Sequence, residues 1–193
     1  GVWTKQKAKR WLRNGNAVDR FTVVLPWQHQ IPMLHLRLLR HWDRRAMSKA
    51  KVLSDLDQRW SRFLEIAKSV PEGKYDEYGS IGWWTVSQSL LHIASWDEEL
   101  VEIMRTYIST GKEHDFDLDH DINDRHLREK RNMDLPMIWR HLDEAHISLL
   151  SYLNTLEEKD FHEDSYTGDL IETMIRQHYW EHEKDIEDFR KTL

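Results

Sequence analysis

The chain has 193 residues, of which 39% are hydrophobic and 32% charged, a balance typical of a folded, helix-rich domain. It contains no cysteine, which excludes disulfides, thiolate nucleophiles and cysteine zinc sites. Any metal must therefore be held by His, Asp or Glu. The absence of cysteine also fits the reducing cytoplasm, where we expect the protein to be located. No stretch approaches the roughly 20 apolar residues of a membrane-spanning helix, so no membrane partner is expected.

The first 46 residues differ in charge from the rest of the chain. Residues 1–46 contain ten Lys or Arg and two acids, net +8, whereas residues 47–193 have a net charge of −14. The basic segment shows no sustained period. We interpret it as an extension outside the functional fold, non-native or disordered; a targeting peptide or an arm that contacts nucleic acid is the alternative. The acidic domain at 47–193 repels phosphates, which argues against nucleic-acid binding by that domain.

Two amphipathic helices are predicted in the first half of the main domain. Residues 48–69 place apolar side chains at three- and four-residue steps. After a loop over 71–82, Thr85 begins a capping box with the glutamine three residues later, and the helix that follows runs to about Ser109. Gly111 stops it. Its apolar arc is wide, as expected of a helix that packs against several neighbours.

An acidic connector, "KEHDFDLDHDIND", follows this helix. Its alternating aspartates resemble the start of a calcium-binding loop. The sixth and twelfth positions of such a loop would be His120 and His126, however, where an EF-hand needs glycine and glutamate. We therefore reject an EF-hand and predict a solvated loop that leads into a polar helical segment, "INDRHLREKRNM".

Two further helices complete the prediction. Asp134 is placed to cap the first of them, with Pro136 in its first turn, where the missing N–H does no harm. A loop over 157–168 separates it from the last helix, at about 169–191. Four main helices and no strand signal predict an all-α fold, an antiparallel four-helix bundle over 47–193.

The last helix contains two histidines four residues apart, in "RQHYWEHEKDIEDF". On a helical wheel with His178 at zero, His182 falls at about 40° and Asp185 at about −20°, in the middle of the apolar stripe. Burying these groups is costly unless each finds a partner. Because side chains at i and i+4 can reach one ion, we favour a divalent metal; hydrogen bonds to neighbouring helices are the alternative.

A metal needs a further ligand from another helix, and helical periodicity does not single one out. His92 lies about 130° from the centre of the apolar arc of its helix, and His141 and His146 lie off the centre of theirs. The other histidines fall in the extension, in loops or in polar segments: His29, His35, His41, His114, His120, His126 and His162.

The same stretch matches H-x-x-E-H, the pattern of inverted zinc peptidases. Those enzymes take a further ligand from downstream sequence, and only eleven residues follow His182. We therefore do not favour a peptidase. Glu181 as a base beside a metal site is a weaker hypothesis.

A histidine in "LLHIASWDEEL", a long interval and then H-x-x-x-H in the last helix resemble the DinB-like superfamily, which includes DinB and YfiT-like proteins. The tryptophan before the second helix, in "GWWTVSQSLLHI", agrees with this superfamily, and the segments "DHDINDRHLREKR" and "HYWEHEKDI" resemble its ClbS/DfsB branch. The resemblance covers about residues 47–191. It implies a four-helix bundle, often a homodimer, with a divalent ion, zinc or nickel, bound by His92, His178 and His182.

The function implied by this resemblance is that of a metal-dependent enzyme. Three protein ligands leave a coordination position open, which suits a hydrolase or a thiol-dependent transferase that acts on a small molecule, with a low-molecular-weight thiol as a possible partner. Asp97 and Asp185 could orient the ligands. The alternative is a non-catalytic stress or damage-inducible protein that binds a metal or another ligand. The sequence does not identify catalytic residues.

Overall fold

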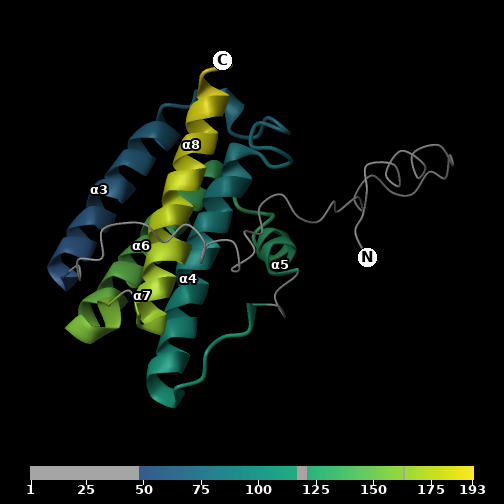
Figure 1. The fold of residues 1–193 in the computed structure, drawn as a ribbon. Coiled ribbons are helices and arrows are strands. Elements are labelled where there is room, and N and C mark those ends of the chain that lie inside the picture. Colours follow the sequence, from purple (N-terminus) through teal and green to yellow (C-terminus); the bar gives the residue numbers. More distant parts are fainter. Residues whose placement is uncertain (1–47, 117–120, 163) are drawn as a thin grey trace, which may run out of the picture. The chain divides into compact units, whose positions relative to one another are not determined.

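The computed structural model describes residues 48–116, 121–162 and 164–193 (Figure 1). These ranges contain no strand, and none of their helices is long and apolar enough to cross a membrane. The predicted all-α class is therefore confirmed, whereas the predicted extension at 1–46 lies outside the described residues. The helices are α3 (Lys49–Lys68), the 3-10 turn η1 (Glu72–Lys74), α4 (Val86–Thr110), α5 (Ile122–Glu129), α6 (Leu135–Thr155), the 3-10 turn η3 (Glu158–Phe161), α7 (Tyr166–Leu170), the π-helix η4 (Ile171–Gln177) and α8 (His178–Arg190).

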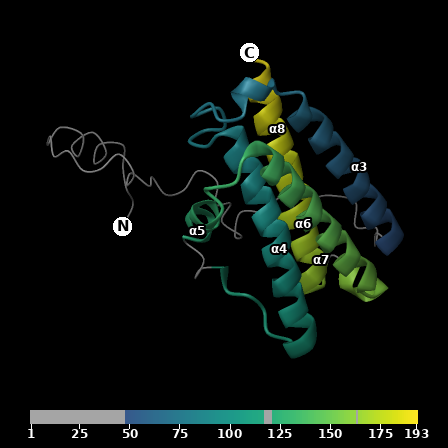
Figure 2. The same ribbon diagram turned by 180° about the vertical axis from the view of Figure 1, so that it is seen from behind.

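The four long helices form a bundle made of two pairs (Figures 1 and 2). Helix α3 packs against α8, and α4 packs against α6. Within each pair the contacts advance in the same direction along both helices, so the paired helices run parallel. The contacts that show this are Asp55–Arg176 and Arg62–Glu183 beside α3, and Asp97–His146 and Arg105–Tyr152 beside α4.

Between the two pairs the helices run antiparallel. The Lys68 side chain of α3 lies over the ring of Trp139 near the start of α6, while Lys49 at the start of α3 reaches the backbone of Asn154 near the end of α6. The predicted antiparallel packing thus holds between the pairs. The long connection that contains α5 returns the chain to the end of the bundle where α4 began, and α6 therefore runs parallel to α4.

The predicted caps at Thr85, Gly111 and Asp134 are confirmed. Ser48, Thr85 and Asp134 each accept a hydrogen bond from a backbone amide in the first turn of the helix that follows, and Thr85 forms the capping box. Gly111 ends α4 with a φ of 71°, a left-handed conformation that glycine adopts without the steric cost of a Cβ. Caps therefore fix where α3, α4 and α6 begin.

The last predicted helix is not one regular α-helix. Ser165 caps the short α7, residues 171–177 form a π-helix, and α8 begins at His178. A π-helix bonds each amide to the carbonyl five residues back, so each residue rotates less about the axis than in an α-helix. Ile171 and Ile175 are nevertheless fully buried, as the stripe predicted.

Four buried side chains, one from each long helix, contact one another at the centre of the bundle. The hydroxyl of Tyr179 on α8 donates to Oδ2 of Asp97 on α4 at 2.6 Å. Because that proton is committed, Nδ1 of His146 on α6, 3.0 Å from the same hydroxyl, is the donor to it. Trp60 on α3 stacks on His146 with ring centroids 3.7 Å apart. We call these four residues the central quartet.

Burial dominates the electrostatics of the quartet. It raises the pKa of Asp97 above its ordinary value, and the hydrogen bonds from His146 and Tyr179 act in the opposite direction. Burial and the neighbouring Asp97 together raise the pKa of Tyr179 well above its ordinary value, so its hydroxyl keeps its proton and remains a donor. Removing the Tyr179 hydroxyl would leave Asp97 and His146 buried without their shared hydrogen-bond partner, which costs more than the loss of a single exposed hydrogen bond.

We expect Tyr179→Phe to lower the free energy of unfolding by about 1–3 kcal/mol, because Asp97 loses its closest donor while remaining buried. Urea denaturation followed by circular dichroism measures the change. Tyr152→Phe is the matched control: Tyr152 is half-buried on α6, and its hydroxyl has no hydrogen bond within the described ranges. Equal losses in the two variants would contradict a stabilising role for the quartet.

Candidate metal centre

Three histidines from two helices meet at one point in the structure. Nε2 of His178 lies 2.8 Å from Nε2 of His92 and 3.0 Å from Nε2 of His182. His92 and His182 are buried and His178 is half-buried. The structure thus brings together the three side chains that the family resemblance indicated, in an arrangement that could hold a metal ion.

Local geometry explains why these side chains converge. His178 is the first residue of α8, and His182 follows one turn later on the same side. Helix α4 runs antiparallel to α8 and presents His92 at the level of His178. Two of the three rings therefore come from one helix turn, and the position of the third depends on how α4 packs against α8.

The spacing of the nitrogens fits a metal ion. With metal–nitrogen distances of about 2.0–2.1 Å and angles of about 90–109°, two imidazole ligands lie about 2.8–3.4 Å apart. The separations around His178 fall in that range. Lone pairs cannot approach this closely unless a proton or a cation lies between them, and one cation can serve all three rings. The histidine set therefore passes a geometric test for a divalent ion.

Burial also keeps the ring of His178 neutral. It lowers the pKa of His178 from its ordinary value of 6.5 to about 4, so the ring is neutral at neutral pH. A neutral imidazole offers a lone pair, whereas an imidazolium does not. All three donors are imidazole nitrogens, which bind zinc, copper, nickel and iron in preference to calcium or magnesium.

Ser89 supports one of the three histidines and was not singled out from the sequence. Its hydroxyl lies 3.1 Å from Nδ1 of His182, and its side chain is fully buried. A hydrogen bond at Nδ1 fixes the orientation of the ring and leaves Nε2 directed at the other histidines. Ser89 stands three residues before His92, on the same side of α4, and that spacing is the signal that could have identified it.

Aromatic rings surround His92. The ring of Trp84 lies 4.7 Å from that of His92, and the ring of Trp96 lies 6.4 Å away. Trp96 also donates from Nε1 to Oδ1 of Asn123 at 2.9 Å and packs edge-on against His126 of α5. His126 is therefore buried, although the sequence placed it in a polar segment. These rings reduce the access of water to the histidines from this side.

The remaining candidate side chains have other partners. His146 belongs to the central quartet, and Nε2 of His141 lies 3.6 Å from Glu98. Asp97 bonds to Tyr179, so it orients the residue that follows His178 in the chain. Glu181 lies near Asp185, and burial first and that carboxylate second raise its pKa.

Comparisons with known proteins agree with this fold. The sequence profile described as the DinB superfamily matches residues 55–180, a range that contains His92 and His178 and ends two residues before His182. The crystal structure of a protein from Streptococcus pneumoniae is similar, with a TM-score of 0.65, 12% identity and coverage of 81% of this chain and 96% of that one. No match was found among curated proteins. The likeness to the ClbS/DfsB branch stays a prediction. The profile match extends over more than half of the chain, which therefore belongs to the DinB superfamily.

Proposed function

We propose that the protein is a metal-dependent enzyme that acts on a small molecule, with a divalent ion held by His92, His178 and His182. The observation that carries this proposal is the convergence of the three Nε2 atoms. Zinc or nickel suits an all-imidazole ligand set that combines two side chains of one helix with one from its neighbour.

The ligand number favours catalysis over a purely structural role. Three protein ligands leave a position open, as catalytic sites do, while structural zinc sites are closed by four. A divalent ion at such a site supplies Lewis-acid chemistry toward a thiol or a carbonyl oxygen, which supports a thiol-dependent transferase or a hydrolase. Ser89 holds the His182 ring in place, and Trp84 and Trp96 give the substrate an apolar surface beside His92.

We expect the purified protein to contain about one divalent ion per chain. His178→Ala should abolish metal binding, because the ring of His178 contacts both other histidines. Elemental analysis by mass spectrometry measures the metal. His162→Ala replaces an exposed histidine and should keep it. The proposal would be contradicted by a wild-type protein that contains no metal and whose unfolding temperature is the same with and without chelator. A ligand that binds the folded state raises that temperature.

Replacing Ser89 by alanine should weaken metal binding by about 10–100-fold, because the ring of His182 loses its hydrogen-bonded support. Competition with a chromophoric chelator gives the affinity. Ser87→Ala is the matched control, since Ser87 is also buried on α4 but its hydroxyl has no partner within the described ranges. If both variants bind metal equally well, Ser89 does not position His182.

Turnover distinguishes an enzyme from a non-catalytic metal-binding protein of the same fold. The metal-loaded protein is assayed with small thiols together with electrophiles, esters, amides and epoxides. We expect turnover of at least one class, lost in His178→Ala and retained in His162→Ala. Metal-dependent melting without turnover of any class would instead support the non-catalytic alternative.

A further inference from the structure

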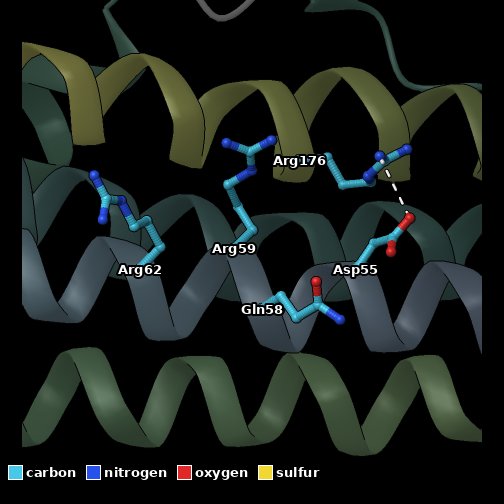
Figure 3. Close-up of a pocket in the computed structure, with 5 residues that line it drawn as sticks. All are labelled: Asp55, Gln58, Arg59, Arg62 and Arg176. Atoms are coloured by element: carbon cyan, nitrogen blue, oxygen red, sulfur yellow. Dashed lines mark ion pairs between the residues drawn. The ribbon is translucent and has the colours of Figure 1, made fainter.

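A groove on a different side of the last helix has no role in the metal centre. It lies between α3 and the segment formed by η4 and α8, with a volume of about 330 Å³ (Figure 3). The residues that line it are Asp55, Gln58, Arg59, Arg62 and Arg176. Three guanidinium groups and one carboxylate give this wall a charge of +2, although residues 47–193 carry −14 in total. We propose that this groove binds a small anion that carries a phosphate group.

Helix geometry brings the three arginines together. Asp55, Arg59 and Arg62 stand at i, i+4 and i+7 on α3 and therefore share one face of that helix. Arg176 extends from the last turn of η4 on the opposite side of the groove, and the guanidinium of Arg59 lies between those of Arg62 and Arg176 (Figure 3). An anion in the groove could thus contact positive charge from both helices.

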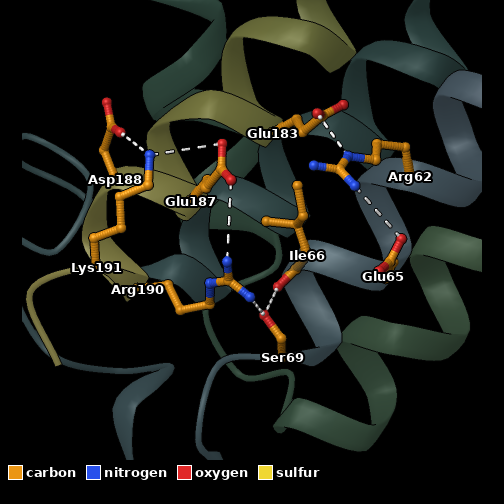
Figure 4. Close-up of polar contacts among 9 residues, drawn as sticks. All are labelled: Arg62, Glu65, Ile66, Ser69, Glu183, Glu187, Asp188, Arg190 and Lys191. Atoms are coloured by element: carbon orange, nitrogen blue, oxygen red, sulfur yellow. Dashed lines mark hydrogen bonds and ion pairs between the residues drawn. The ribbon is translucent and has the colours of Figure 1, made fainter.

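The guanidinium groups keep donors available for a ligand. Each guanidinium has five N–H donors. Within the described ranges, the closest polar contact of Arg59 is an ion pair with Glu183 at 3.8 Å, which is too long for a hydrogen bond. Arg62 donates from Nε to Glu183 at 3.3 Å and lies 3.8 Å from Glu65 (Figure 4). Arg59 is therefore the arginine least engaged by the protein itself.

Glu172 and Glu183 pair with the arginines from outside the groove, whereas Asp55 lines it. Glu183 has a side chain only 12% exposed and does not line the groove. Arg176 pairs with Glu172 one turn before it on the same helix and lies 3.8 Å from Asp55. The alternative is that these pairs only join α3 to α8. That alternative predicts stability effects but no ligand.

The chemistry of the lining indicates the ligand class. Planar guanidinium groups bind phosphate through paired hydrogen bonds, and several of them around one space are typical of phosphate recognition. A volume of about 330 Å³ lies at the lower end of the range for small-molecule sites. The proposed ligand is therefore a compact phosphate compound.

Calorimetric titration of the full-length protein with inorganic pyrophosphate tests this inference. We expect saturable binding that weakens as salt rises, and Arg59→Gln should weaken it by about tenfold or more, because a charge-assisted contact is lost. Arg105→Gln is the matched control: it removes an exposed arginine of α4 that pairs with Glu102, and it should bind as the wild type does.

Two further variants make the outcome unambiguous. His178→Ala should keep full pyrophosphate binding. This result would show that pyrophosphate binds in the groove and not to a metal ion at the histidines, and it does not depend on whether the proposed function is correct. Arg59→Lys keeps the charge without the planar fork and should bind with intermediate affinity, a result that a misfolded protein would not give. Absence of saturable binding to the wild type, or equal binding by Arg59→Gln, would overturn the proposal, as would loss of binding in His178→Ala alone.

Discussion

The hydrogen bond between Tyr179 and Asp97 constrains how the helices of the bundle pack together. It joins α8 to α4 at full burial, and His146 and Trp60 extend it to the other two long helices. Tyr179 immediately follows His178, so the rotation of α8 that satisfies its hydroxyl also determines where the histidine rings point. A buried polar group of this kind tolerates little rotation, because any unsatisfied member carries its full desolvation cost.

The sequence predicted the helices and two of the three histidines because local rules govern both. Capping residues marked the starts of α4 and α6, and the i, i+4 spacing of His178 and His182 on an apolar stripe indicated a shared partner. His92 could not be found in this way. Helix α4 buries side chains around most of its circumference, so its apolar arc does not show which side faces α8. The family resemblance, not periodicity, supplied that residue.

What the sequence missed depends on tertiary packing. The wheel treated His146 as peripheral, yet Trp60 from α3 covers its ring. It also assumed regular α-helical rotation through residues 171–177, where the structure forms a π-helix. The parallel pairing of α4 with α6 follows from a long connection whose path no local pattern specifies. Local propensity is compatible with more than one arrangement at each of these places, and tertiary packing determines which one forms.

The segment from Ile171 to Arg190 serves two sides of the bundle at once. Arg176 contacts Asp55 on α3, while His178, two residues later, contacts His92 on α4. Side chains two residues apart on a helix point to nearly opposite sides, so one helical segment can supply both surfaces. The same geometry limits change: a rotation that improved one surface would displace the other, and the buried Tyr179 opposes both.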